Sequence, residues 1–186
     1  MEPSRKGRFL FLYNPYFCTL DCFIHPKGYW IKKMSKTETV KSNLEQGYNC
    51  AQAILAAFAG DYGMSRDLAL KLSLNLGGGC AFRGEICGAV STALLIYGLH
   101  FGSEQPVDEL SQEIVFHLSS DHIREFKQTF GTITCRELLG RDIGSPDDFA
   151  MIMENDLFRL KCPKFILDSV RILERNIEEA EEKFRR

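Results

Sequence analysis

Three of the seven cysteines stand where a helix is expected to begin, and this placement is the first sign of chemistry in the chain. Cys87 follows a glycine-rich turn and falls on the first turn of an apolar helix. Cys135 follows Thr134 in a capping-box pattern. Cys162 precedes Pro163, so it is expected to be an N-cap. Helix starts stabilise anions, and the placement therefore predicts lowered pKa values for these three thiols.

The glycine-rich turn over residues 77–89 is the second feature with chemical meaning. Its glycines suit a backbone that must come close to a ligand. It lacks the Lys-Ser or Lys-Thr of a phosphate loop and does not follow a strand, which argues against nucleotide binding. The residues expected to contact a bound cofactor are Gly78, Gly79, Cys80, Gly84 and Gly88.

Composition narrows the class of protein. A chain of 186 residues is about one domain, and its apolar content of 45% is enough for a buried core. The net charge of −2 gives no footprint for nucleic acid, and no segment is long and apolar enough for a membrane span. Seven cysteines are too few for a disulfide scaffold. These features predict a cytoplasmic protein whose cysteines do chemistry.

The first 33 residues differ from the rest in charge. They carry six basic and two acidic residues, whereas residues 34–186 carry 17 basic and 23 acidic residues. We expect residues 1–33 to be an extension that is poorly ordered or artefactual, with a basic, aromatic arm docked on the body as the alternative. Residues 34–186 are expected to form a helical domain that holds the cysteine cluster.

The pattern of the domain predicts an all-α fold: a compact multi-helix bundle with an apolar central helix and a long C-terminal helix. Glycine, proline and capping residues divide the apolar runs. The expected helices are Lys36–Phe58 with a kink at Gly47, Arg66–Leu76, Glu85–Leu99 at the centre, Val107–Phe130, Cys135–Leu139, a short helix opening at Ser145, and Pro163 to the end.

The last helix carries apolar residues at heptad spacing. The simpler interpretation is a stripe that packs in the bundle, and the sharper one is a coiled coil that makes a homodimer through the C-terminal helix. The stripe consists of Ile166, Val170, Leu173, Ile177, Ala180 and Phe184.

Four segments together resemble the C_GCAxxG_C_C family, whose redox activity is inferred from its cysteines. They are residues 47–55, residues 77–89, residues 135–140 and Cys162-Pro163. The resemblance covers about residues 41–175 and implies a small helical protein with four key cysteines, which map to Cys50, Cys87, Cys135 and Cys162. The chain departs from the family pattern at Thr92, where the family has glycine, and Cys80 is an additional thiol.

Redox chemistry at these four cysteines is the leading hypothesis, with a thiol-dependent oxidoreductase as the class of enzyme. The thiols either cycle with a disulfide or bind an iron–sulfur cluster or another soft metal. The redox partner is unknown. The alternative is a non-catalytic interaction module stapled by a structural zinc site made of the same four cysteines.

Roles within the set follow from the expected helix starts. Cys87 is predicted to be the most reactive thiol, and Cys50, expected in the middle of a helix, to resolve or to ligate. Three histidines share no metal-binding spacing, so we expect them to be solvated or capping; they are His100, His117 and His122.

Overall fold

The structure is a computed structural model that describes residues 22–24, 30–32 and 34–184. The chain divides into two units, Met1–Met34 and Ser35–Arg186. In the first unit, strands β1 (Cys22–Ile24) and β2 (Trp30–Lys32) pair antiparallel, with Phe23 opposite Ile31. Apart from these strands, the expectation for residues 1–33 lies outside the described residues and stays a prediction.

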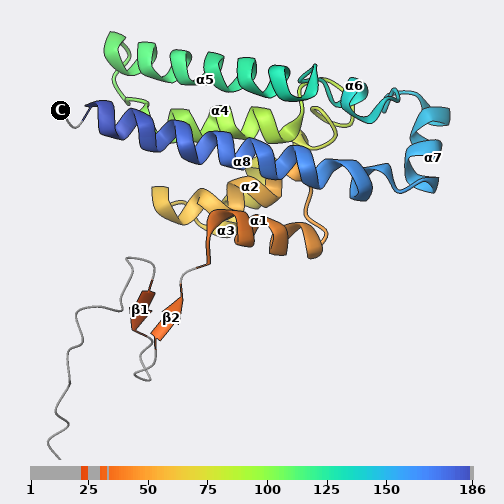
Figure 1. Ribbon diagram of the computed structural model, residues 1–186, viewed down its shortest axis with the longest axis horizontal. Coiled ribbons are helices and arrows are strands. Elements are labelled where there is room, and N and C mark those ends of the chain that lie inside the picture. The colour runs from red at the N-terminus through yellow and green to blue at the C-terminus, as the bar shows by residue number, and fades with distance from the viewer. Residues whose placement is uncertain (1–21, 25–29, 33, 185–186) are drawn as a thin grey trace, which may run out of the picture. The chain divides into compact units, whose positions relative to one another are not determined.

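The second unit is a bundle of helices, as predicted (Figure 1). The chain order is α1 (Lys36–Glu45), α2 (Cys50–Phe58), η1 (Ala59–Tyr62), α3 (Arg66–Ser73), η2 (Leu74–Leu76), α4 (Gly88–Phe101), α5 (Glu109–Phe130), α6 (Cys135–Leu139), α7 (Pro146–Glu154) and α8 (Leu157–Phe184). None of the helices in the described part of the chain is both long and apolar enough to cross a membrane.

The first expected helix is two helices, because the chain breaks completely at Gly47. Gly47 has a φ of 89°, a conformation that suits glycine after a helix end. Asn49 then caps α2: its side chain accepts from the backbone N–H of Ala51 and Gln52, and the Gln52 side chain accepts from the Asn49 N–H. Cys50 therefore lies at the start of a helix and not in the middle of one.

Helix α4 is the centre of the bundle and packs against α2, α5 and α8 (Figure 1). Most of its buried residues are small or apolar, and Val90 and Ile96 are completely buried. Leu95 and Leu99 are exposed, so the helix is central without being covered on every side. Burial of this face positions the start of α4, where Cys87 is the N-cap residue.

Helix α8 begins at Leu157, six residues before the expected start at Pro163. Proline is favoured at a first helical position but is tolerated further inside at a cost, since it removes one N–H from the helix. Cys162 is thus inside a helix and is not an N-cap. The apolar stripe of α8, from Ile166 to Ala180, faces the chain's own core, as the simpler interpretation expects, and a homodimer through this helix stays a prediction.

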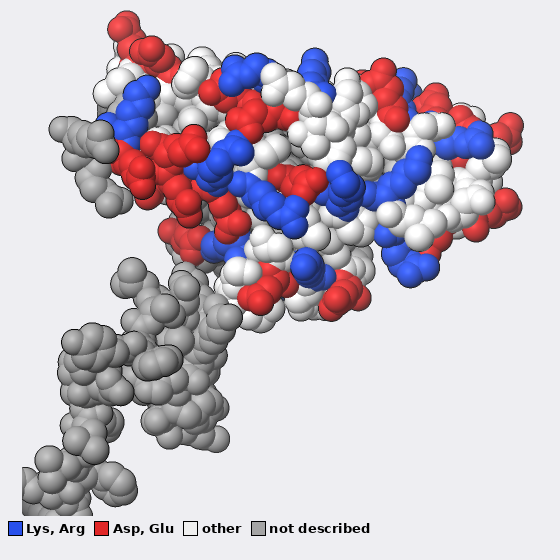
Figure 2. Space-filling view, viewed as in Figure 1, with Lys and Arg blue, Asp and Glu red and all other residues white. Residues whose placement is uncertain are grey.

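Basic side chains along α8 are balanced by acids. Figure 2 shows Lys and Arg side chains along this helix, with acidic side chains beside them. Four of them pair with carboxylates: Arg159 with Asp156, Lys164 and Arg171 with Asp168, and Arg175 with Glu125.

Candidate functional site

One pocket of about 350 Å³ is lined by four cysteines from four different parts of the chain. They come from the start of α2, the residue before α4, the start of α6 and the interior of α8, and all four are free thiols. Cys80, which is also free, does not line this pocket. The set is Cys50, Cys87, Cys135 and Cys162.

Cys50 is the thiol whose charge acts on each of the other three cysteines in the pocket. Its negative charge would raise the pKa of Cys87, of Cys135 and of Cys162. Like Cys162, Cys50 is also partly exposed, whereas Cys87 and Cys135 are each only 5% exposed. Cys50 therefore combines access from the pocket with proximity to every other thiol in it.

Backbone N–H groups surround the sulfur of Cys50. Burial raises the pKa of this thiol, and hydrogen bonds from the backbone of Gly78, Ala51, Cys50 itself and Gly88 oppose the rise. Two of these groups belong to the first turn of α2, and one each to the glycine-rich turn and the first turn of α4. Such an arrangement stabilises a thiolate as it forms, because N–H dipoles favour a negative charge.

The expected lowering of the thiol pKa values is wrong. Burial raises the pKa of Cys135 to about 12, and it raises those of Cys87 and Cys162 too. At Cys87 the N–H groups of Ala89 and Val90 act in the expected direction, but desolvation by the surrounding core is the larger effect. The helix start at Cys87 was predicted correctly, and its burial was not.

The glycines serve contacts within the chain. Of the five residues expected to contact a cofactor, Gly78 lines the pocket, and Gly79, Cys80, Gly84 and Gly88 do not. A Cβ on Gly79 would lie 2.8 Å from the Cβ of Cys135, and one on Gly84 would lie 3.0 Å from the Cβ of Arg136. These glycines let the turn approach the segment that carries Cys135.

A left-handed turn shapes one wall of the pocket. Five consecutive residues, 78–82, have positive φ values between 53° and 70°. Cys80, Ala81 and Phe82 are not glycines, and each such residue costs roughly 1–2 kcal/mol in this conformation. Backbone hydrogen bonds hold the turn, including one of 3.1 Å from Gly84 N–H to the Gly78 carbonyl. The strained turn places Gly78 and the Phe82 ring at the pocket.

Backbone hydrogen bonds join the two segments that carry the buried residues Cys87 and Cys135. The Cys87 N–H donates to the Ile133 carbonyl at 2.8 Å, and the Cys135 N–H donates to the Glu85 carbonyl at 2.7 Å. Ile86 and Thr134 form an isolated antiparallel bridge between these bonds. The starts of α4 and α6 are thereby held side by side.

The start of α6 is capped in an unexpected way. Thr134 is the N-cap residue, as predicted, but its side chain does not accept from the backbone of α6. Its hydroxyl donates instead to the carboxylate of Glu137 at 2.7 Å.

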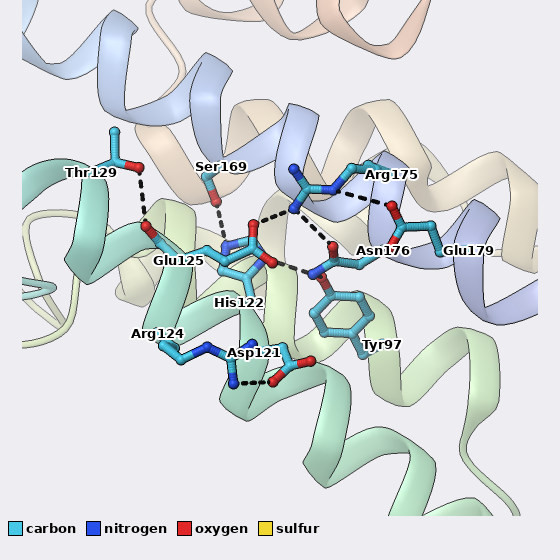
Figure 3. Close-up of polar contacts among 10 residues, drawn as sticks. All are labelled: Tyr97, Asp121, His122, Arg124, Glu125, Thr129, Ser169, Arg175, Asn176 and Glu179. Atoms are coloured by element: carbon cyan, nitrogen blue, oxygen red, sulfur yellow. Dashed lines mark hydrogen bonds and ion pairs between the residues drawn. The ribbon is translucent and has the colours of Figure 1, made fainter.

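A buried polar network includes His122, Ser169 and Tyr97 (Figure 3). Ser169 Oγ donates to the Ala89 carbonyl at 3.1 Å, so it accepts from His122 Nε2 at 3.0 Å. His122 Nδ1 then accepts from the Tyr97 hydroxyl at 3.1 Å, and Tyr97 accepts from Asn176. The tautomer of His122 is assigned from this network. His122 is completely buried, so the expectation of a solvated or capping residue is wrong for it.

This network ties α4, α5 and α8 together two residues after Cys87. Burial and the nearby Arg175 lower the pKa of His122 to about 4, so the ring is neutral near pH 7. A neutral ring is what the network requires, because Nδ1 must accept a hydrogen bond.

The thiols are not arranged around one point. Within residues 34–183, no group of three or more His, Cys, Asp or Glu side chains is placed to hold a metal ion. The four cysteines thus share a pocket without forming a ready ligand set.

The order of the cysteines along the chain matches a known family. Residues 48–176 match the family described as "Putative redox-active protein (C_GCAxxG_C_C)". The chain belongs to this family. The matched range includes all four cysteines of the pocket. The hexapeptide GCAxxG in the family's description is Gly79–Gly84, so Cys80 belongs to the named pattern, and the expected departure at Thr92 and the status of Cys80 as an additional thiol are wrong. Comparisons with curated proteins and with solved structures gave no match.

Proposed function

We propose that the protein is a thiol-dependent oxidoreductase in which Cys50 attacks a disulfide and Cys87 resolves the product. The observation that carries this proposal is that one pocket is lined by four free cysteines, with Cys50 electrostatically coupled to the other three. The attacking thiol must be reachable, and Cys50 and Cys162 are the partly exposed residues of the four; of these two, only Cys50 acts on all three other thiols. This reverses the roles that the helix starts predict.

The chemical steps balance as two thiol–disulfide exchanges. The Cys50 thiolate attacks one sulfur of the substrate, a new S–S bond forms, the substrate S–S bond breaks, and a thiolate leaves and takes up a proton. The Cys87 thiolate then attacks the Cys50 sulfur and releases the second half of the substrate. The substrate disulfide is reduced to two thiols, and the protein is oxidised by two electrons. A dithiol reductant is needed to restore it.

The backbone N–H groups around Cys50 contribute at the moment of attack. They stabilise the thiolate as the proton leaves, and they offset part of the cost of burial. Cys87 follows as the resolving thiol, because the next residue, Gly88, packs against the Cys50 sulfur. The charge of Cys50 acts on Cys87 as it does on Cys135 and Cys162.

A reducing compartment such as the cytoplasm suits this chemistry. Every cysteine in residues 34–183 is a free thiol, as a resting reductant requires.

The alternatives are binding of an iron–sulfur cluster or a soft metal, and a structural zinc site. Metal analysis of protein purified without oxygen separates these alternatives from the proposal. The proposal predicts substoichiometric metal and a disulfide that forms and breaks reversibly. Iron with acid-labile sulfide would establish a cluster, and one zinc per chain would establish a staple; either result would overturn the proposal. Either metal would use Cys50, Cys87, Cys135 and Cys162 as ligands, and the side chains would have to move to form the site.

A further inference from the structure

We propose that the disulfide substrate of this pocket is a small, uncharged, apolar molecule with aromatic character. The inference rests on the proposed function and adds the class of substrate. It comes from the walls of the pocket, which surround the thiols with rings and aliphatic side chains.

The walls are aromatic on several sides. Phe82 and Phe158 meet edge to face with ring centroids 6.3 Å apart, and Tyr48 and Phe165 also line the pocket. These rings come from the left-handed turn, from α8 and from the link between α1 and α2. Leu44 and Ile166 add aliphatic surface. Burial of an aromatic ring against such walls is favourable, because it removes apolar surface from water.

The walls offer little to a charged or strongly polar substrate. Among the described residues, no carboxylate lines the pocket, and Arg159 is the one charged residue there. The Arg159 side chain is 78% exposed and pairs with Asp156, so it points its charge to solvent. Asn49 also lines the pocket, but its side chain is used to cap α2 and to donate to the Leu74 carbonyl.

Size argues in the same direction. A pocket of about 350 Å³ is near the lower end of the range for small-molecule sites. Glutathione disulfide carries charged groups at both ends, and burying such groups without partners is unfavourable. A small aromatic disulfide fits a pocket of this size and has no charged group to bury.

The test compares rates for three disulfides: the neutral aromatic dithiodipyridine, the dicarboxylate dithiobis(nitrobenzoate) and oxidised glutathione. Each rate is divided by the rate for the same protein unfolded in guanidinium chloride, which removes intrinsic differences in reactivity. We expect the corrected rate for dithiodipyridine to exceed the other two by about tenfold or more, since 1.4 kcal/mol is a factor of ten. Arg159→Gln separately measures the effect of that charge.

A matched pair of variants locates the effect in the pocket wall. Phe82 has a φ of 57°, which asparagine tolerates, so Phe82→Asn removes the ring and keeps the turn. This variant should lose most of the selectivity. Phe116→Asn, on an exposed part of α5, should keep it. Diphenyl sulfide, which has no S–S bond, should slow the reaction of the wild type with dithiodipyridine by competition.

The outcomes separate this inference from the proposed function. If the three corrected rates are equal, or diphenyl sulfide gives no protection, the inference about the substrate is wrong and the exchange chemistry stands. If none of the disulfides oxidises Cys50, the proposed function is wrong as well.

Discussion

Gly88 lies against Cys50 so closely that a Cβ on Gly88 would be 2.5 Å from the Cys50 sulfur. The same Cβ would be 2.8 Å from the Leu76 carbonyl, which belongs to the backbone and cannot turn away. The lack of a side chain at Gly88 is therefore a condition for bringing the start of α4 to the thiol at the start of α2.

Gly88→Ala tests this contact. We expect the free energy of unfolding to fall by about 1–3 kcal/mol, because the added methyl group overpacks the site. Cys50 should also be displaced from its N–H groups. Gly98→Ala is the control on the same helix, since a Cβ there meets nothing within 4 Å, and it should stabilise the protein by about 0.5–1 kcal/mol. Equal effects of the two substitutions in urea unfolding would refute the close contact.

Thr92 carries a buried hydroxyl with no hydrogen-bond partner among the described residues. Thr92→Val replaces that hydroxyl with a methyl group of similar size, so we expect a gain in stability of about 1 kcal/mol. Ser73→Ala is the contrast, because the Ser73 hydroxyl is buried and donates to the Ala69 carbonyl at 2.7 Å. It should lose a similar amount. Thermal unfolding of both variants measures the difference, and a loss of stability in Thr92→Val would show that the hydroxyl is satisfied.

His122 should make stability depend on pH. Its pKa is about 4 in the folded protein and 6.5 as a free side chain, so the unfolded chain binds a proton in this range that the native chain does not. The contribution is present above pH 6.5 and is lost as the pH falls toward 4. Between about pH 7 and pH 5 the expected loss is about 2 kcal/mol.

Denaturant unfolding at both pH values checks this expectation. His122→Gln should remove that part of the pH dependence, whereas His117→Gln, at an exposed position on the same helix, should keep it. The same slope in all three proteins would contradict a neutral, buried His122.

Alkylation rates should follow the raised pKa of the pocket thiols. Burial keeps them protonated near pH 7, so iodoacetamide should react more slowly with the reduced, metal-free protein than with the unfolded chain. The rate at Cys50 should keep rising by about tenfold per pH unit beyond about pH 9. A plateau below the pKa of a free thiol would mean that the N–H groups outweigh burial.

The sequence predicted the helical bundle and the four cysteines. It did not predict the features that tertiary contacts determine. Apolar periodicity identified the central helix, and the family resemblance selected the thiols that line the pocket. The helix start at Cys50 was missed although Asn49 and Gln52 carry its signal, because Gly47 was interpreted as a kink.

Burial and strain were beyond local reasoning. A helix start at Cys87 predicts a lowered pKa, and only the packed structure shows that desolvation is larger. The left-handed residues 80–82 could not be foreseen, since side chains disfavour that conformation and only Gly78 and Gly79 suggest it. Similarly, Pro163 favours a helix start because proline is frequent at that position. In the packed bundle, α8 instead begins before it, at Leu157.

Peptide mapping after oxidation tests the central claim most directly. Reduced protein is treated with about one equivalent of diamide, the remaining thiols are alkylated, and the disulfide-linked peptides are identified by mass spectrometry. We predict a Cys50–Cys87 disulfide that dithiothreitol reverses. Cys50→Ser should abolish it, Cys80→Ser should leave it unchanged, and Cys87→Ser should trap Cys50 as a mixed disulfide with dithiodipyridine. Full alkylation of Cys50 in the oxidised wild-type protein would contradict the account.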